Sequence, residues 1–256
     1  MNNLLIINGT TRGLGLAIVK LLVVNKDFKL VCLVRDTNKL SELSLFKNDV
    51  EIYKCDYSST SDALNSIEFF RRIFKNNFNN IFFINNISTI NPVGCLGNIE
   101  NEQIVESINI NITSNLIILN NIVHNAIKNK APAYLLNISS GISINPLPGL
   151  SLYGVGKSFL DYITKNLSLE NMSRNIRVAT FYPGGIDTDM QKTLVTNLKN
   201  REDLKEFSYE KVYAQKLFSA EKIAEIICNN FIINHNGWDK LTSNIYDFIK
   251  QNKSER

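Results

Sequence analysis

A tyrosine and a lysine stand four positions apart at Tyr153 and Lys157, where the chain reads Tyr-Gly-Val-Gly-Lys. On a helix this spacing places both side chains on one face. An ammonium group beside a phenol favours the phenolate, so we expect Lys157 to lower the pKa of Tyr153 from its ordinary value of about 10. A tyrosine adjusted in this way can exchange protons with a substrate near neutral pH.

A glycine-rich segment follows the first apolar run of the chain, with glycines at Gly9, Gly13 and Gly15. Glycine lets the backbone turn tightly and approach a phosphate closely, and the N-terminus of a helix favours negative charge. The segment therefore predicts a pyrophosphate site at a junction between a strand and a helix. The alternative is an ordinary strand-to-helix turn that uses glycine only for its positive φ.

The residues after the second apolar run indicate which dinucleotide would bind. A carboxylate there binds the ribose 2′-hydroxyl of NAD, whereas an arginine suits the 2′-phosphate of NADP. Val34 stands at the carboxylate's expected position, and Arg35 and Asp36 follow it. A second arginine, Arg12, lies inside the glycine turn, and two guanidinium groups suit a phosphate better than a neutral ribose. The sequence favours NADP(H); alternatively, Arg35 is only the solvated start of the next helix.

Short apolar runs alternate with helical patterns, as in a parallel sheet that helices cover on both faces. We therefore expect an α/β fold: a single doubly wound parallel sheet in a Rossmann-type, three-layer domain spanning residues 1–256. The cofactor half would reach about residue 130, and the catalytic and substrate half would begin at about residue 131. Strands are predicted at 4–7, 30–34, 51–53, 81–84, 133–137, 177–181 and near 243–246. Helices are predicted at 15–24, 38–45, 61–75, 102–128, 152–171 and 220–231, with a less regular helical segment at 188–207.

The composition excludes several classes of function. A net charge of +4, with basic residues scattered among acidic ones, does not indicate a nucleic-acid partner. The two histidines, His124 and His235, and the four cysteines show no metal-ligand spacing, so we expect no metal site. The chain has no leader-like segment and no apolar run of membrane-spanning length, which predicts a cytoplasmic protein without a membrane partner.

The motifs together resemble the short-chain dehydrogenase/reductase family, from the first strand to about Met190. Tyr153 stands 13 positions after Ser140, as in that family. The motifs that carry the resemblance are Gly9-x-x-x-Gly13-x-Gly15, Asn85-Asn86, Asn111, Ser140, Tyr153, Lys157 and Pro183-Gly184. The segments most similar to the sepiapterin reductase and benzil reductase branch are Arg35-Asp36, Asn111-Ile-Thr-Ser114, Asn137-Ile-Ser-Ser140 and Asp187-Thr-Asp-Met-Gln191.

The resemblance implies roles for four catalytic residues. It makes Tyr153 the proton donor to a carbonyl oxygen. Lys157 would lower the pKa of Tyr153 and bind the nicotinamide ribose. Ser140 would stabilise the developing oxyanion charge, and Asn111 would hold a water in a proton relay behind Lys157.

The resemblance also implies contacts with a dinucleotide cofactor along the whole edge of the sheet. Besides Tyr153 and Lys157, the implied cofactor-binding residues are Gly9, Arg12, Gly13, Leu14, Gly15, Arg35, Asp56, Asn85, Pro183, Gly184, Ile186 and Thr188. Of these, Asp56 would contact the adenine and Asn85 the adenosine ribose, whereas the last four would form a wall beside the nicotinamide.

The implied activity is reduction of a ketone or diketone to an alcohol with NADPH, by a homodimer or homotetramer built on the helices at 102–128 and 152–171. One alternative is an NAD-linked alcohol or steroid dehydrogenase, and another is a dinucleotide-binding regulator without catalysis. Side chains near the site predict an apolar pocket for the carbonyl substrate, although each could equally be ordinary packing. These are Leu147, Leu150, Phe181, Met190 and Leu194.

Two segments depart from the family pattern. Ile87-Ser88 replaces the family's Ala-Gly, which predicts a local shift in strand pairing beside the cofactor. Near the C-terminus, Tyr246 and not Asp247 takes the position of the aspartate by which sepiapterin reductases hold the pterin. On a strand this one-residue slip would turn Asp247 to the other face.

Overall fold

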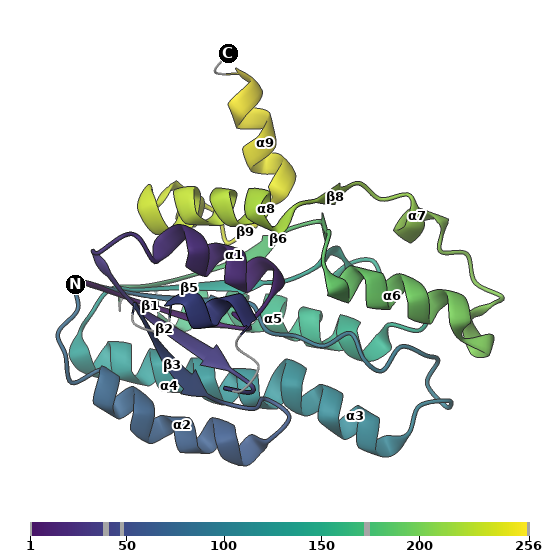
Figure 1. The fold of residues 1–256 in the computed structure, drawn as a ribbon, viewed down its shortest axis with the longest axis horizontal. Coiled ribbons are helices and arrows are strands. Elements are labelled where there is room, and N and C mark those ends of the chain that lie inside the picture. Colours follow the sequence, from purple (N-terminus) through teal and green to yellow (C-terminus); the bar gives the residue numbers. More distant parts are fainter. Residues whose placement is uncertain (1, 38–40, 47–48, 172–174, 255–256) are drawn as a thin grey trace.

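The structure is a computed structural model that describes residues 2–37, 41–46, 49–171 and 175–254 (Figure 1). Within these ranges, seven parallel strands form one sheet in the order β3-β2-β1-β4-β5-β6-β9. The strand order reverses between β1 and β4, and in sheets of this kind ligands bind at the carboxyl ends of the strands beside such a reversal. The strands are β1 (Asn3–Asn8), β2 (Phe28–Val34), β3 (Val50–Lys54), β4 (Asn80–Asn85), β5 (Ala133–Ile138), β6 (Ile176–Tyr182) and β9 (Thr242–Asn244).

Helices cover both faces of this sheet (Figure 1). Successive residues of a strand point to opposite faces, so Ile7 lies in the core on the α1 and α8 side and Ile6 in the core on the α2, α4 and α5 side. The expected doubly wound, three-layer α/β fold is confirmed. The helices that cover the sheet are α1 (Gly13–Leu22), α2 (Thr60–Ile73), α4 (Ser114–Asn129), α5 (Ser151–Glu170) and α8 (Ala220–Ile227).

The remaining elements lie at the edges of this framework. The other helices are α3 (Asn101–Ile108), α6 (Asp189–Asn200), α7 (Glu210–Tyr213) and α9 (Ile245–Ser254). Two short strands, β7 (Gly185–Ile186) and β8 (Leu217–Phe218), pair in parallel. The π-helical turns are Asn109–Thr113 and Cys228–Ile233. The 3₁₀ turns are Ser41–Phe46, Gly141–Ser143, Glu202–Leu204 and Asn236–Asp239.

Three predicted helices differ from the structure. The helix expected at 220–231 ends as α8 at Ile227, where the π-helical turn Cys228–Ile233 begins. The helix expected at 38–45 is a 3₁₀ turn over Ser41–Phe46, and its residues 38–40 lie outside the described residues. The helix expected at 102–128 is divided into α3 and α4 by the π-helical turn Asn109–Thr113. Apolar periodicity does not register the one extra residue that a π-turn inserts, so the sequence pattern looked continuous.

The strand expected near 243–246 ends at Asn244, and α9 begins at Ile245. Tyr246 N–H donates to Asn244 Oδ1 at 2.9 Å, and Asn244 N–H donates to Asp247 Oδ2 at 2.8 Å. These reciprocal bonds cap the start of a helix. The inference that a one-residue slip turns Asp247 to the other face of a strand is therefore wrong, because Asp247 caps a helix.

The shift in strand pairing expected at Ile87 is also wrong. Strand β4 stays in register with β1 at Ile84 opposite Ile7, and with β5 at Asn85 opposite Asn137. The chain beyond β4 is held by Asn8, whose Oδ1 accepts from the N–H of Ile87 at 2.8 Å. The Ile87 side chain packs against the core on the α2 and α4 side, so this core accommodates its larger volume.

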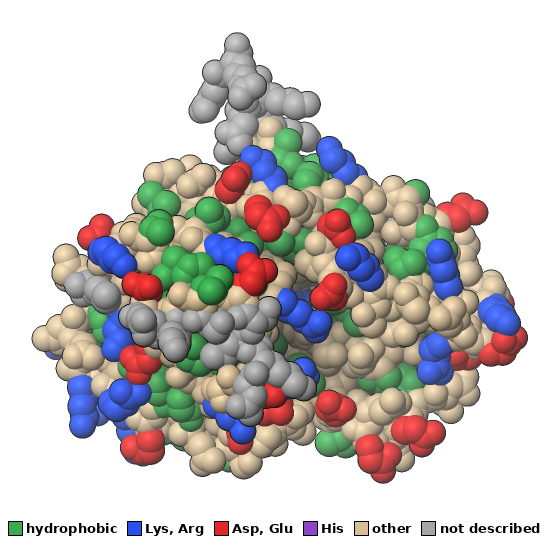
Figure 2. Space-filling view, in the orientation of Figure 1, with side chains coloured by type: hydrophobic (Ala, Val, Ile, Leu, Met, Phe, Trp, Pro, Cys, Tyr) green, Lys and Arg blue, Asp and Glu red, His purple; other side chains and the backbone are tan. Residues whose placement is uncertain are grey.

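The surface view in Figure 2 shows basic and acidic side chains interspersed over this face. Several form ion pairs, including Lys29 with Glu51 at 2.8 Å and Lys26 with Asp49 at 3.1 Å. Among the residues that the structure describes, no helix is long and apolar enough to cross a bilayer.

Candidate active site

The glycine turn joins β1 to α1 at the reversal of strand order. Gly9 and Gly13 have φ values of +67° and +55°, which favour glycine. A Cβ on Gly15 would lie 2.2 Å from the Gly9 carbonyl oxygen, so only glycine fits there. The first turn of α1 has no acidic residue, and no side chain caps its amides. The turn therefore presents free N–H groups at a helix N-terminus and fits a pyrophosphate.

The two arginines expected to favour a 2′-phosphate lie near this turn. Asn8 pairs with Leu33 at the ends of β1 and β2, so Arg35 leaves the sheet beside the start of the glycine turn. Arg35 is exposed. Arg12 Nη1 lies 3.8 Å from Asp189 Oδ2, but both side chains are more than 60% exposed, and such a pair is weak. Both guanidinium groups are therefore accessible to an anion.

A chain of buried amide and hydroxyl side chains runs along the same edge of the sheet. Asn8 Nδ2 donates to Asn85 Oδ1 at 2.8 Å, and Asn85 Nδ2 donates to Asn137 Oδ1 at 2.9 Å. Asn137 Nδ2 donates to Thr164 Oγ1 at 2.8 Å, and Thr180 Oγ1 donates to the same oxygen at 2.9 Å. We call these five residues the asparagine chain. The side chain of Asn85, expected beside the adenosine ribose, is only 1% exposed and is used inside the protein.

Asn111 lies in the π-helical turn between α3 and α4 and is 3% exposed. Its Oδ1 accepts from the Thr89 N–H at 2.9 Å, and its Nδ2 donates to the Thr89 carbonyl at 3.0 Å and to Ser107 Oγ at 3.2 Å. A Cβ on Gly156 would lie 2.6 Å from the Asn111 Cβ. Gly156 therefore lets α5, which carries the tyrosine and the lysine, lie directly against this turn.

Tyr153, Lys157 and Ser140 meet where α5 passes the end of β5. The half-buried Tyr153 hydrogen-bonds the Ser140 hydroxyl, and the Lys157 ammonium lies 5.5 Å from the centre of the Tyr153 ring. Lys157 is 3% exposed and donates from Nζ to the Ile138 carbonyl at 2.8 Å. Ser140 also begins the 3₁₀ turn after β5, where its Oγ accepts from the Ile142 N–H at 3.4 Å.

Burial controls the electrostatics of this group. It raises the pKa of Tyr153 from 10 to about 12, which the Ser140 hydrogen bond opposes. It lowers the pKa of Lys157 from 10.5 to about 8, which the Asp161 carboxylate opposes. The expectation that Lys157 lowers the tyrosine pKa below its ordinary value is therefore wrong for this structure. Desolvation disfavours each charged form, and the ammonium bonds the Ile138 carbonyl.

Asp161 and Tyr182 are site residues that the sequence motifs did not single out. Asp161 lies one helical turn after Lys157, and its Oδ2 accepts from the Tyr182 hydroxyl at 2.7 Å. Tyr182 is the last residue of β6, so this bond ties α5 to the sheet behind the lysine. The spacing of four between Lys157 and Asp161 was a readable signal, because it places both on one helix face.

The loop after β6 reaches back over the glycine turn. A Cβ on Gly13 would lie 3.3 Å from Thr188 Cγ2, so the expected cofactor residues of the turn and of this loop come together. Pro183 is buried, Gly184 has a φ of +71°, and Ile186 belongs to β7. Leu14, in contrast, is 5% exposed and packs in the core, so only its backbone faces the turn.

Asp56 follows β3 at the same edge, and its carboxylate accepts hydrogen bonds from a neighbouring residue. Its Oδ1 accepts from the N–H of Ser58 at 2.9 Å and from the Ser58 hydroxyl at 2.8 Å. These bonds close a turn that leads into α2, so the structure gives Asp56 a local structural role beside its expected contact with adenine.

The apolar pocket expected beside the catalytic residues is built differently from the prediction. Leu147, Leu194 and Tyr153 pack against a separate cluster made by the loops after β4 and β5 and by the segment after β6. Phe181 is wrong as a pocket residue, because it is fully buried in the core against Phe231 and Phe248. We call this separate cluster the pocket wall; its buried members are Val93, Ile142, Leu150, Leu198, Leu204, Tyr209 and Val212.

Over the ranges that the structure describes, no group of three or more histidine, cysteine or acidic side chains could hold a metal ion. Among the same residues, the four cysteines are unpaired, and only Cys95 is not buried.

A doubly wound sheet with a glycine turn at its reversal, and a serine, tyrosine and lysine at its carboxyl edge, defines a dinucleotide-binding oxidoreductase. A family model described as short chain dehydrogenase matches residues 3–199. The chain belongs to the short-chain dehydrogenase family, as the motifs indicated.

Known proteins extend this likeness beyond the matched segment. The chain is 27% identical over 235 residues to a benzil reductase ((S)-benzoin forming) of Bacillus cereus, covering 88% of this chain and 92% of that protein. The expected likeness to the benzil reductases is thus confirmed. A short-chain dehydrogenase from Sphingobium yanoikuyae, solved with NADPH, has a TM-score of 0.75 at 17% identity and covers 99% of this chain and 94% of its own. A 3-ketoacyl-(acyl-carrier-protein) reductase from Brucella melitensis, solved with NADH, has the same score and identity, with 95% and 96% covered.

The lowered pKa of Lys157 predicts a measurable effect on stability. Between pH 8 and 10.5 the unfolded chain binds a proton at Lys157 that the folded chain does not, so this residue makes stability rise with pH. We expect Lys157→Met to lose this contribution, about 3 kcal/mol over the range. The measurement is urea unfolding of both proteins, under reducing conditions, at intervals across this pH range.

Only the difference between the two proteins is informative in that experiment. Burial raises the pKa of the Cys32, Cys55 and Cys228 thiols to about 12, which lowers stability as pH rises over the same range. These thiols are common to both proteins and cancel. Parallel stability curves for the wild type and Lys157→Met would show that the folded protein does not hold Lys157 in the neutral form.

Proposed function

We propose that this protein reduces a ketone or diketone carbonyl to an alcohol with NADPH. The observation that carries the proposal is the meeting of Ser140, Tyr153 and Lys157 at the sheet edge that also holds the glycine turn. The benzil reductase of Bacillus cereus, similar over most of both chains, supports a diketone as the substrate class.

Proton supply to the substrate falls to Tyr153. A phenol whose pKa is about 12 is protonated throughout the neutral range, which is the form that can give a proton to a carbonyl oxygen. The Ser140 hydroxyl, which contacts the phenol here, would turn its single hydrogen to the same carbonyl oxygen as negative charge develops there. When bound, NADPH supplies the hydride for the carbonyl carbon.

The hydrogen bond to the Ile138 carbonyl holds the Lys157 ammonium near Tyr153, and the negative charge of Asp161 favours its protonated form. As the proton moves from the phenol to the substrate oxygen, a neighbouring ammonium stabilises the phenolate that remains. With a pKa of about 8, Lys157 is largely protonated at pH 7. The NAD-linked dehydrogenase, the rival within the enzyme class, needs the phenolate of Tyr153 before it reacts, and burial disfavours that form.

The test of this function is Tyr153→Phe, with Tyr162→Phe as the matched control on the same helix. Tyr162 is 68% exposed, so its hydroxyl has no part in the site. We expect Tyr153→Phe to lose roughly 100-fold to 10,000-fold in kcat for NADPH oxidation with benzil, because the general acid is gone. Affinity for NADPH, measured by fluorescence titration, should change far less than kcat, because Tyr153 is one of many implied cofactor contacts.

Two outcomes would contradict the proposal. Turnover that survives in Tyr153→Phe would remove the tyrosine from its role. Tight NADPH binding without turnover of benzil, sepiapterin or other carbonyls would favour the remaining rival, a dinucleotide-binding regulator without catalysis.

The preference for NADP(H) rests on Arg12 and Arg35 beside the glycine turn. We expect Arg35→Ala to weaken NADPH binding by roughly 10-fold to 100-fold, since a hydrogen bond to a charged group contributes about 1.5–3 kcal/mol. Binding of NADH, which has no 2′-phosphate, should change little. Dissociation constants of both nucleotides are measured for this variant and for Arg71→Ala, an exposed arginine on α2. An unchanged ratio of the two constants would exclude this cofactor assignment.

We propose that the protein assembles through α4 and α5, as the family resemblance implied. A groove of about 370 Å³ lies between these helices, with the apolar residues Leu116 and Ile127 exposed along it. Leu116→Arg should convert a dimer or tetramer to the 29.0 kDa monomer in light scattering. Val24→Arg, at the end of α1 and 75% exposed, should leave the mass unchanged. A wild-type protein that is already monomeric would refute the proposal.

A further inference from the structure

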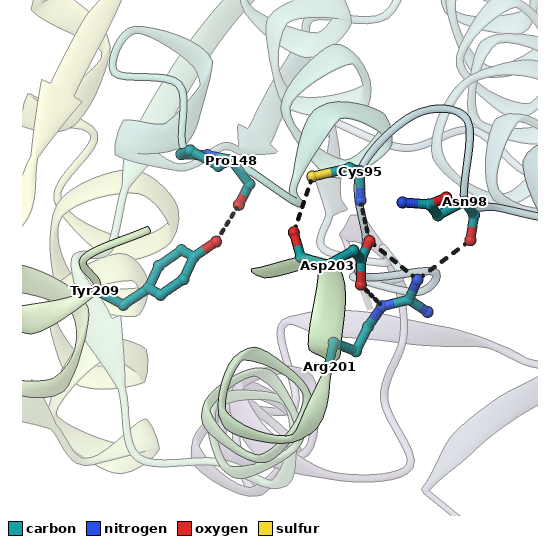
Figure 3. Close-up of polar contacts among 6 residues, drawn as sticks. All are labelled: Cys95, Asn98, Pro148, Arg201, Asp203 and Tyr209. Carbon is teal, nitrogen blue, oxygen red and sulfur yellow. Dashed lines mark hydrogen bonds and ion pairs between the residues drawn. The ribbon is translucent and has the colours of Figure 1, made fainter. Parts of the chain in front are cut away.

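The segment after α6 is fastened across two loops beside the catalytic tyrosine (Figure 3). One loop follows β4 and contains Cys95 and Asn98, and the other lies between Ser140 and Tyr153 and contains Pro148. The fastened segment carries Arg201, Asp203 and Tyr209, far from both loops in sequence.

Arg201 and Asp203 form a forked ion pair that also binds the loop after β4. Arg201 Nε lies 2.8 Å from Asp203 Oδ1, and Arg201 Nη2 lies 3.2 Å from Asp203 Oδ2. Asp203 Oδ2 accepts from the Cys95 N–H at 2.9 Å, and Arg201 Nη2 donates to the Asn98 carbonyl at 3.2 Å (Figure 3). We call Arg201, Asp203 and their contacts with Cys95 and Asn98 the latch. Because each charged group also bonds loop backbone, the pair differs from an isolated surface ion pair.

The latch is fitted closely to the loop that it holds. A Cβ on Gly94 would lie 2.7 Å from Arg201 Nη2, so a larger residue would push the guanidinium away. The Asp203 side chain is 16% exposed. The Arg201 guanidinium and the Cys95 amide hold the pKa of that carboxyl well below its usual range, so the pair stays charged at any working pH.

A second set of contacts fastens the same segment to the loop before Tyr153. The Tyr209 hydroxyl donates to the Pro148 carbonyl at 3.1 Å. A Cβ on Gly149 would lie 2.8 Å from Leu204, which is fully buried against that glycine. The two loops are joined in turn, because the Gly94 N–H donates to the Gly149 carbonyl at 2.9 Å.

These contacts bear directly on the catalytic tyrosine. Leu204 and Tyr209 belong to the pocket wall, against which Tyr153 and Leu147 pack. A displacement of the segment after α6 would therefore move apolar side chains that lie beside Tyr153.

We propose that Arg201 and Asp203 are positioning residues that hold the pocket wall closed beside Tyr153, so that the carbonyl substrate enters a preformed pocket. This role in substrate binding rests on the proposed reductase function, whereas the closure of the wall does not. Since Arg201 and Asp203 themselves contact none of Ser140, Tyr153 and Lys157, their loss should raise KM for the substrate more than it lowers kcat.

The first test uses the reactivity of the Cys95 thiol to measure whether the pocket wall is closed, and it needs no substrate. Cys95 is the cysteine that is not buried among the described residues, and its Sγ donates to the Asp203 carbonyl at 3.5 Å. In Asp203→Asn, which loses the ion pair, we expect Cys95 to react with a maleimide roughly tenfold faster than in the wild type, because a charge-assisted bond contributes about that factor. Cys95→Ser serves as the blank that assigns the reactive thiol.

Glu202→Gln is the matched control. Glu202 adjoins Asp203 in the same 3₁₀ turn, but its carboxylate is 85% exposed and pairs with Lys205, directly after that turn. It should leave the reactivity of Cys95 unchanged. Arg201→Lys, which keeps the charge and loses the fork, should give an intermediate rate.

The second test measures how loss of the ion pair changes substrate binding. Asp203→Asn should raise KM for benzil roughly tenfold, with kcat reduced less and the NADPH dissociation constant unchanged. Equal Cys95 reactivity in Asp203→Asn, Glu202→Gln and the wild type would overturn the latch, even if the enzyme reduces benzil. Faster Cys95 reactivity with kcat lowered and KM unchanged would overturn the positioning role. Even if the protein reduces no carbonyl, the reactivity of Cys95 still shows whether the latch closes the pocket wall. The reductase proposal and the latch proposal can therefore fail independently.

Discussion

The asparagine chain is the constraint on which the site depends. Parallel strands end in backbone groups that have no partner beyond the sheet, and here buried amides connect those ends from β1 to β6. An asparagine suits this place because its side-chain amide both donates and accepts hydrogen bonds. Each asparagine can therefore accept a bond from one strand and donate a bond to the next. The cost of leaving one of these buried groups unpaired is about 1–3 kcal/mol, which favours a single register for all four strands.

The same chain determines where α5 lies. Thr164 stands on α5 two turns after Lys157 and accepts bonds from both Asn137 and Thr180, so the helix is fixed to β5 and β6 at that depth. Gly156 lets the other side of the helix touch the π-helical turn at Asn111. Ser139 Oγ, directly before Ser140, donates to the Lys157 carbonyl at 3.3 Å. Helix α5, which carries Tyr153 and Lys157, is thus held by buried contacts to neighbouring elements.

The strands and the glycine turn could be predicted because local sequence determines them. Six of the predicted strands match within about two residues, since a strand buried on both faces appears as a continuous apolar run. The π-turn at Asn111 could not, because one inserted residue leaves the apolar pattern of α3 and α4 almost unchanged. The pairing of Arg201 with Cys95 joins residues more than 100 positions apart through Asp203, and no local pattern encodes it. Phe181 was misplaced because the sequence does not show that its ring packs against Phe231 and Phe248, which lie 50 or more positions later in the chain.

The largest difference from the sequence-based expectation is electrostatic, and it follows from the same packing. A tyrosine and a lysine on one helix face predict mutual stabilisation of their charges, but that argument leaves out desolvation. Desolvation favours the neutral form of both groups and separates their pKa values to about 12 and about 8. Contacts that the sequence motif does not contain oppose these pKa shifts. The Ser140 hydroxyl acts on Tyr153, whereas the Ile138 carbonyl and Asp161, which Tyr182 holds, act on Lys157. The electrostatics of the site therefore depend on the strand ends as well as on α5, because β5 supplies the Ile138 carbonyl that binds Lys157 and β6 supplies Tyr182, which holds Asp161.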